Sequence, residues 1–201
     1  MAEGQYHHGD LRAALLAQAE VTLRQSGVDG LSLRELARAV GVSHGAPRRH
    51  FQDKAALLDA LVAEGLHRLG SVLDAAADVG HGDFGDALRA VALAYVRFAT
   101  ENPPLIELMS RGIYLAYASQ ELIAAREMSF VPVRKLVEGG QATGRLVGGD
   151  VRRQGTLIFA TLHGLATMAN NGMIDPNDED LVIEAVNSLV AGLRPADPRH
   201  S

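Results

Sequence analysis

Nitrogen donors gather in one short run of the sequence, HGAPRRHFQDK, from His44 to Lys54. The run holds three Lys or Arg side chains and two histidines against a single Asp. Guanidinium and ammonium groups bind phosphate oxygens, and an arginine fork can also hold a guanine through two hydrogen bonds. These residue types therefore favour contact with the phosphates and base edges of a nucleic acid.

Two short helices would position these donors. Residues 33–40 and 44–50 have helical spacing, and Gly41 between them can take the positive φ that turns the chain. Ser32 and Glu35 have the spacing of a capping box at the first of these helices. The pair also has the small or apolar residues that a tight helical corner needs, namely Leu33, Leu36, Ala37, Val40, Val42 and Phe51.

The second helix of the pair would expose a face without carboxylates. Its exposed positions are His44, Gly45, Arg48 and Arg49, with His50 near its end. Such a face suits a DNA major groove bordered by phosphates. An ordinary helical hairpin with a solvated face is the alternative, but the caps, Gly41 and the acid-free face together favour a helix-turn-helix.

The charge balance of the whole chain at first opposes DNA binding, because its 201 residues carry a formal net charge of −5. The first 55 residues, however, hold seven Lys or Arg and six Asp or Glu, so the acidic excess lies in the remainder. Phosphate contact is local and is screened beyond about 10 Å. An acidic body with a locally basic surface is therefore compatible with DNA binding.

Helical spacing continues through the rest of the chain, and alternating strand patterns are almost absent, so the fold class is expected to be all-α. Aspartates at 53 and 150 are placed to cap helices. Besides the short pair above, the pattern predicts helices over residues 10–25, from 53 through 72, and over 84–101, 103–109, 119–139 (bent at Pro132), 150–170 and 179–193.

Residues 6–61 resemble the DNA-binding domain of the TetR family of transcriptional regulators. The resemblance rests on YHHGDLRAALLAQA, LSLRELARAVGVS and RHFQDKAALL. More loosely, AVALAYVRFATENPPLIELM and LHGLATMANNG resemble a subset of the family with a Trp-His-Gly-type ligand domain, although this chain has no Trp. The resemblance implies a three-helix DNA-binding domain at residues 6–53, a larger helical ligand-binding and dimerisation bundle at 54–195, and a disordered tail at 196–201.

The resemblance also assigns roles within the first domain. The helix from His44 to His50 would enter the major groove, with Ser43, His44 and Gly45 near base edges and phosphates. Arg48 stands where the family usually carries a Tyr that touches the DNA backbone, and an arginine there could bind a phosphate or a guanine. The expected DNA-binding residues are Tyr6, His8, Ser32, Ser43, His44, Gly45, Arg48, Arg49, His50 and Lys54, with a frayed terminus as the alternative role for Tyr6 and His8.

The second domain would hold a ligand and a partner subunit. The expected pocket residues are Tyr95, Phe98, Met109, Tyr114, Met128, Phe130, Leu162 and His163, of which Tyr95, Tyr114 and His163 have buried polar tips that need partners. An ordinary core is the alternative for the others. The last two helices resemble a dimer interface, with Leu165, Met168, Val186, Leu189 and Val190 as its residues, or else a stripe that faces their own core.

The sequence as a whole thus predicts a ligand-responsive regulator of the TetR type, a repressor by family habit, that binds a pseudo-palindromic DNA operator as a homodimer. No cofactor, metal or membrane partner is expected, and the absence of cysteine and of an apolar leader suits the cytoplasm. The rival classes are an enzyme, for which HExxH, GxSxG and phosphate-loop motifs are missing, and a helical module that binds another protein.

Overall fold

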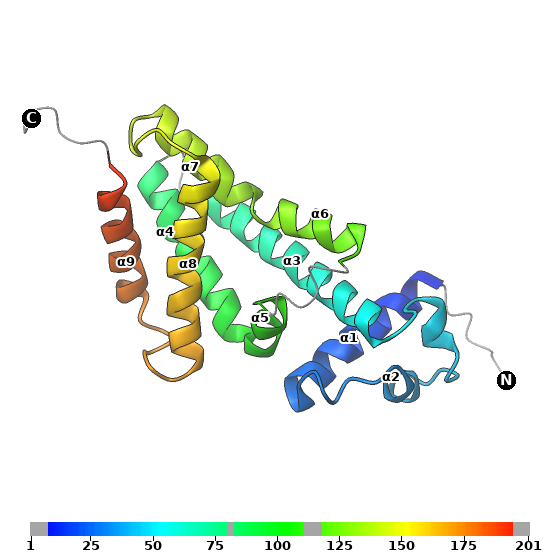
Figure 1. Ribbon diagram of the computed structural model, residues 1–201. Helices are drawn as coiled ribbons and strands as arrows, with labels where there is room; N and C mark the ends of the chain where they lie inside the picture. The colour runs from blue at the N-terminus through cyan, green and yellow to red at the C-terminus, as the bar shows by residue number, and fades with distance from the viewer. Residues whose placement is uncertain (1–7, 80–82, 111–117, 195–201) are drawn as a thin grey trace, which may run out of the picture. The chain divides into compact units, whose positions relative to one another are not determined.

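The computed structural model describes residues 8–79, 83–110 and 118–194. Within these ranges every regular element is a helix, which confirms the all-α prediction (Figure 1). The elements are α1 His8–Ser26, α2 Leu33–Ala39, the short 3-10 helix η1 Ala46–Arg49, α3 Lys54–Val79, α4 Phe84–Glu101, α5 Pro103–Ser110, α6 Gln120–Ser129, α7 Val131–Ala142, α8 Val151–Asn170 and α9 Glu179–Gly192.

Aspartate caps fix the starts of several helices, as the sequence predicts. Asp53 Oδ1 accepts a hydrogen bond from the Ala56 backbone N–H at 2.9 Å in the first turn of α3. Asp150 Oδ1 accepts from the backbone N–H groups of Arg152 and Arg153 in the first turn of α8, at 2.8 and 3.1 Å. Each carboxylate satisfies backbone donors that have no partner inside the helix, and so sets the residue at which the helix begins.

The single bent helix predicted over residues 119–139 is wrong. The structure has two helices there, α6 and α7, with Phe130 between them. Pro132 is the second residue of α7, and proline has no N–H to continue a helical hydrogen-bond ladder from the preceding turn. The proline therefore starts a new helix instead of bending an existing one.

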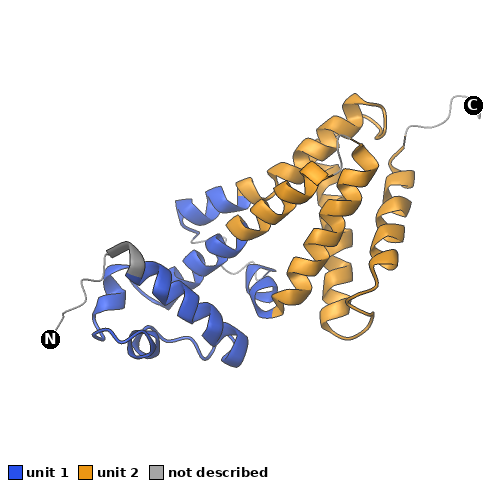
Figure 2. Cartoon of the chain, turned by 180° about the vertical axis from the view of Figure 1, so that it is seen from behind, with its two compact units in different colours: residues 1–66, 104–126 blue, residues 67–103, 127–201 orange. Residues whose placement is uncertain are grey.

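The chain forms two compact units, which Figure 2 colours separately. Unit 1 comprises residues 1–66 and 104–126, and unit 2 comprises 67–103 and 127–201. The units do not follow the boundary at residue 53 that the family resemblance implies, because α3 and α6 each supply residues to both. Unit 1 thus holds the predicted DNA-binding helices together with most of α5 and of α6.

In unit 2, α4 is the central helix and packs against α7, α8 and α9. Its buried face includes Leu88, Val91, Ala92, Tyr95 and Phe98. Within the described residues no helix is long and apolar enough to cross a membrane.

The packing of unit 2 leaves no room for a side chain at Gly140. A Cβ there would lie 2.8 Å from Cε2 of Phe84 and 3.0 Å from Cδ1 of Leu146, whereas a Cβ on Gly139 would meet nothing within 4 Å. We therefore expect Gly140→Ala to lower the free energy of unfolding by about 1–3 kcal/mol through overpacking. Gly139→Ala, its control on the same helix, should raise that free energy by about 0.5–1 kcal/mol. Urea unfolding of both variants measures the difference, and equal effects at the two positions would contradict this packing.

Candidate DNA-binding surface and ligand cavity

The turn between α2 and η1 is a complete helix C-cap motif centred on Gly41. Gly41 has φ +74°, a left-handed conformation that a side chain would strain. Its N–H donates to the Arg38 carbonyl at 3.2 Å, and the Val42 N–H donates to the Ala37 carbonyl at 2.9 Å. These two bonds satisfy the last carbonyls of α2 and fix the direction in which the chain leaves it.

The second helix of the motif is shorter than the predicted range of 44–50. η1 spans four residues, Ala46 to Arg49, and its bonds join residues three apart: the Ala46 N–H donates to the Ser43 carbonyl, and the His50 N–H to the Pro47 carbonyl, both at 3.0 Å. Pro47 has no N–H to bond the carbonyl of Ser43, so the α-helical hydrogen bond that would include residues 44–46 in a helical turn cannot form. Ser43, His44 and Gly45 consequently lie in the turn that precedes η1.

Arg48 and Arg49 are exposed on η1, as are Ser43, His44 and Gly45 before it. Neither arginine pairs with a carboxylate of the described residues. The chain carries no acidic residue from 36 to 52, so nothing in this segment neutralises the two guanidinium groups. The surface around η1 can therefore offer both charges to an anion.

The remaining residues expected to contact DNA differ in how exposed their side chains are. His50 and Lys54 are half-buried, at the end of η1 and the start of α3. Ser32 precedes α2 in an extended conformation without a side-chain cap bond, and Glu35 pairs with Arg38, so the predicted capping box is wrong. Tyr6 and the side chain of His8 lie outside the described residues.

Arg12 of α1 joins the helix-turn-helix to α6 within unit 1. Its guanidinium lies over the ring of Phe51, 5.8 Å from the centroid, and Nη2 donates to both Glu121 carboxylate oxygens at 2.9 and 3.0 Å. Phe51 is buried immediately after η1. Nearby, Ser119 bonds Asp59 of α3 and caps α6 through the Leu122 N–H. The start of α6 is thus attached to both α1 and α3.

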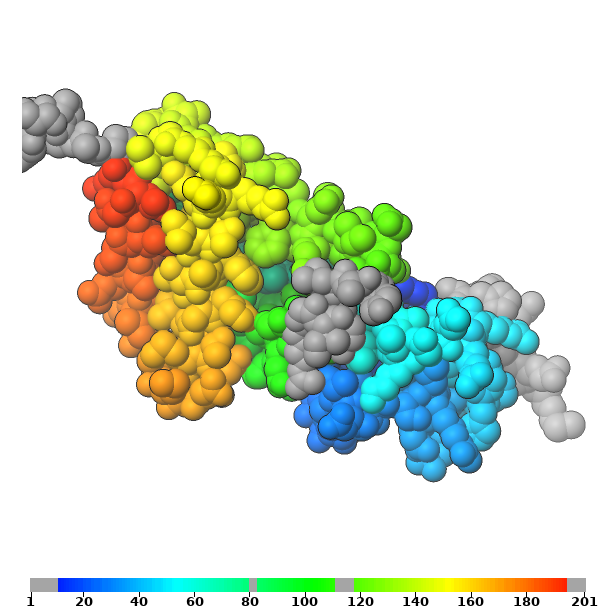
Figure 3. All heavy atoms as spheres, viewed as in Figure 1, coloured from blue at the N-terminus to red at the C-terminus, as the bar shows by residue number. Residues whose placement is uncertain are grey.

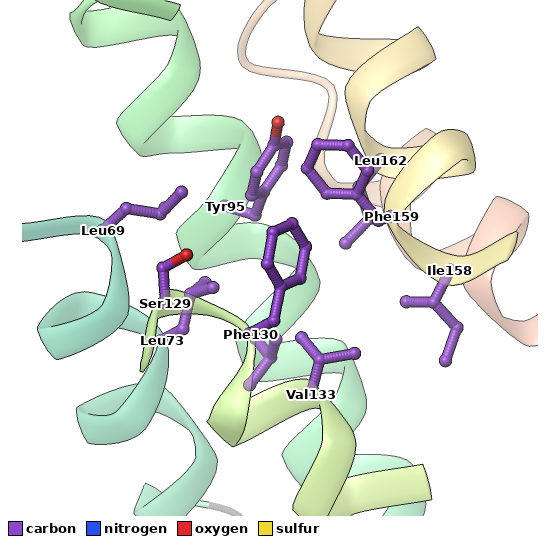
Figure 4. A pocket seen from close by; sticks show the side chains of 10 residues that line it. Leu69, Leu73, Tyr95, Ser129, Phe130, Val133, Ile158, Phe159 and Leu162 are labelled. Atoms are coloured by element: carbon purple, nitrogen blue, oxygen red, sulfur yellow. The ribbon is translucent and has the colours of Figure 1, made fainter. Parts of the chain in front are cut away.

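A small cavity lies in unit 2 between the second half of α3, α4, α7 and α8. Its volume is about 10 Å³, and Figure 4 shows its aromatic rings pointing toward one another. The lining residues are Leu69, Leu73, Val91, Tyr95, Ser129, Phe130, Val133, Ile158, Phe159 and Leu162. None of them is charged, so this is an apolar site with two hydroxyl groups.

Tyr95 and His163 supply the polar end of this region. The Tyr95 hydroxyl and His163 Nδ1 share a hydrogen bond of 3.0 Å, and the His163 ring stacks on Phe159 with centroids 5.4 Å apart. Burial raises the pKa of the Tyr95 phenol well above its usual range, so the hydroxyl stays protonated in neutral solution.

The structure brings together only some of the expected pocket residues. Tyr95, Phe130 and Leu162 line the cavity, and His163 joins it through Tyr95. Phe98 is buried elsewhere on α4, one helical turn beyond Tyr95, and Met128 is exposed. Met109 belongs to unit 1, where its sulfur lies 3.2 Å from the place of a Cβ on Gly65. Tyr114 lies outside the described residues.

Phe159 is the principal cavity residue that the sequence reasoning missed. It contacts Tyr95, Phe130 and His163, with ring centroids 5.1–5.6 Å apart. It stands four residues before His163 on α8, and residues four apart share one face of a helix. That spacing could have identified it once His163 was chosen. The remaining missed residues are apolar side chains with no signal that separates a cavity wall from a core.

Comparisons with known proteins cover both units. Residues 15–61 match the family model described as "Bacterial regulatory proteins, tetR family", and residues 88–193 match "Tetracyclin repressor-like, C-terminal domain". The second match alone takes in more than half of the chain. This chain belongs to the TetR family. It is accordingly a regulator with a DNA-binding domain and not an enzyme.

Solved structures share the whole fold of this TetR-family chain. A protein of unknown function from Rhodococcus sp. RHA1 is 42% identical, with a TM-score of 0.85 over 96% of this chain and 100% of its own. A TetR family transcription regulator from Marinobacter aquaeolei VT8, 19% identical, shares the fold with a TM-score of 0.75 over 92% and 96%. Among curated proteins, the nucleoid occlusion factor SlmA of Haemophilus ducreyi is 29% identical over 57% of this chain and 61% of its own length.

Side chains of α8 and α9 lie at the surface of unit 2 on the face drawn in Figure 3. Met168 is exposed, and Leu165, Leu189 and Val190 are half-buried, so these four can reach a partner. Val186 is buried in the core of its own unit, so little of its side chain is accessible to a partner. Leu157, which the prediction left out, is exposed on the same face of α8 as Met168.

Proposed function

We propose that this chain is a ligand-responsive repressor that binds a pseudo-palindromic operator as a homodimer. The observation that carries DNA binding is the acid-free surface around η1, where Arg48 and Arg49 are exposed and unpaired with any described carboxylate. Two-fold symmetry of a dimer would present this surface twice and so match two half-sites. Binding to chromosomal DNA would place the protein in the cytoplasm.

The proposed dimer uses the exposed apolar side chains of α8 with the half-buried ones of α9. Leu157 and Met168 are large apolar side chains that are 49% and 38% exposed, and they lie three helical turns apart on one face of α8. A second copy of the chain would remove them from water. The proposed operator-bound state is therefore the dimer.

The proposed DNA contacts are the ten residues of the sequence analysis, with Arg48 and Arg49 as the principal ones. Ligand response is proposed for the cavity around Tyr95 and Phe159, because it is apolar, lies apart from η1 in the sequence and belongs to the other unit. A ligand there would lower the affinity for the operator only if it binds the DNA-free conformation of the protein more tightly than the DNA-bound conformation.

A gel-shift titration with the DNA upstream of the gene tests the proposal. We expect a single shifted complex with a dimer on one palindromic site, and competition by that site but not by unrelated DNA. Absence of any sequence-selective complex would contradict the function. Capture of a partner protein by a chain that binds no DNA would favour the helical interaction module instead.

A further inference from the structure

The short helix η1 depends on residues outside it for its orientation. Of its four residues only Pro47 is buried, so η1 has little apolar surface of its own to hold it in place. The backbone N–H groups of His50 and Phe51 both donate to the Pro47 carbonyl, at 3.0 and 2.9 Å. Phe51 is 2% exposed. Its buried ring therefore anchors the end of η1, next to Arg48 and Arg49.

Arg12 of α1 holds this ring through its guanidinium group. The group lies 5.8 Å from the centroid of the Phe51 ring, within the distance at which a cation is attracted to an aromatic face. Nη2 of Arg12 donates to both carboxylate oxygens of Glu121, at 2.9 and 3.0 Å, which limits how the guanidinium can turn. These contacts, all within unit 1, lead in series from Glu121 through Arg12 and Phe51 to η1.

The ion pair in this series lies at the surface. The Arg12 and Glu121 side chains are 37% and 52% exposed, so removing either one leaves no buried charge without a partner. Exposed ion pairs contribute little to the free energy of unfolding. Substitutions at these two positions should therefore leave the chain folded and act on its neighbourhood, which includes η1.

The charge of Glu121 separates a positioning role from a direct one. A carboxylate repels DNA phosphates, so on electrostatic grounds alone its removal should strengthen operator binding. If Glu121 instead keeps Arg12 on Phe51, its removal should weaken operator binding. The two roles thus predict changes of opposite sign.

We infer that Arg12 is a positioning residue for operator binding, which Glu121 holds against Phe51 so that η1 keeps the conformation that presents Arg48 and Arg49. The inference rests on the proposed DNA contacts of η1. Without this support η1 would populate other conformations as well. The apparent operator affinity would then fall in proportion to the fraction of molecules that remain competent to bind.

Glu121→Gln tests the sign of the effect. The variant loses the charge that holds the guanidinium, and we expect about 2–5-fold weaker operator binding by fluorescence anisotropy at fixed salt. Asp29→Asn is the matched control, because Asp29 is an exposed carboxylate of unit 1 that forms no ion pair with a described residue. It should not weaken operator binding.

Arg12→Ala separates positioning from contact with DNA. We expect a loss of affinity like that of Glu121→Gln, with an unchanged slope of log affinity against log salt. A direct phosphate contact would reduce this slope by about 1. Because Glu121 acts through Arg12, adding Glu121→Ala to Arg12→Ala should cause no further loss.

Hydrogen exchange of the DNA-free chain gives a measurement that needs no operator. In Glu121→Gln and in Arg12→Ala, the amides of residues 46–51 should exchange at least about 3-fold faster, and those of α2 should be unchanged. Circular dichroism verifies the fold of each variant. Arg12→Lys, which keeps the charge but not the planar fork, replaces Arg12→Ala if the latter unfolds.

Three results would overturn the inference: operator binding by Glu121→Gln as tight as that of the parent, a salt slope reduced by about 1 in Arg12→Ala, or unchanged exchange of residues 46–51 in both variants. The proposed function fails by a different result, the absence of any operator complex with the parent chain. In that case the exchange measurement alone decides whether Arg12 positions η1.

Discussion

Replacing Arg48 with alanine weakens operator binding by about 1–3 kcal/mol and leaves the melting temperature unchanged. The guanidinium is exposed on η1 and makes no ion pair with a described carboxylate, so its loss removes nothing from the fold. On DNA, the same group would bind a phosphate or a guanine. Fluorescence anisotropy with a labelled operator at fixed salt measures the loss.

The control is Arg152→Ala, which removes an equally charged and exposed side chain from α8 in unit 2. It should leave the operator affinity within about 0.5 kcal/mol of the parent, as for a surface substitution away from the site. Equal losses in the two variants would show that net charge, and not the position of Arg48, governs binding.

Salt dependence separates the two roles open to Arg48. If it binds a phosphate, Arg48→Ala should weaken all operator variants alike and reduce the slope of log affinity against log salt by about 1. If it binds a guanine, the loss of affinity should depend on one base pair of each half-site. At that base pair the variant should no longer distinguish guanine from the other bases. The same measurements on Arg49→Ala show which arginine has which role.

Met168→Glu should separate the proposed dimer into folded monomers. The Met168 side chain is 38% exposed on α8, so glutamate costs little in a single chain. In a two-fold interface the carboxylate would be buried without a partner, and an uncompensated buried charge costs about 3–5 kcal/mol. Sedimentation should give half the parent mass, and a full operator should lose the tight complex, while a half-site binds weakly.

Val72→Glu is the matched control, because Val72 is also 38% exposed in unit 2 but lies on α3. It should leave the mass and the operator complex unchanged. A Met168→Glu variant that still sediments as a dimer would exclude this face of α8 as the interface. A dimer broken equally by Val72→Glu would place the contact on α3.

Helix ends were predictable where a local chemical signal sets them. Asp53 and Asp150 bond the free N–H groups of the helices they precede, and Gly41 takes the left-handed turn its position suggested. The errors arose where two local signals compete. In the sequence pattern Pro132 suggests a bend, but in the structure it lies at the start of a helix, and Glu35 pairs with Arg38 instead of completing a capping box. Which partner prevails depends on geometry that spacing alone does not contain.

The cavity was harder to predict because its residues come from four segments far apart in the chain. Helical periodicity shows that Tyr95 faces inward, but not which residue it meets. Met109 and Phe130 look alike in such a pattern, yet Met109 belongs to unit 1 and Phe130 to the ring cluster in unit 2. Only the tertiary arrangement distinguishes a cavity wall from an ordinary apolar contact.

Because unit 1 contains residues beyond the DNA-binding helices, those helices cannot simply be exchanged between relatives. A chimera that transfers residues 6–53 alone would separate Arg12 from its Glu121 partner, and Asp59 with Ser119 would stay behind in the host. Residues 1–66 and 104–126 form the unit that carries these contacts together. Transfer of operator specificity to a relative therefore requires moving both stretches of sequence together. Because of these contacts, we expect the DNA-binding helices and α6 to evolve together.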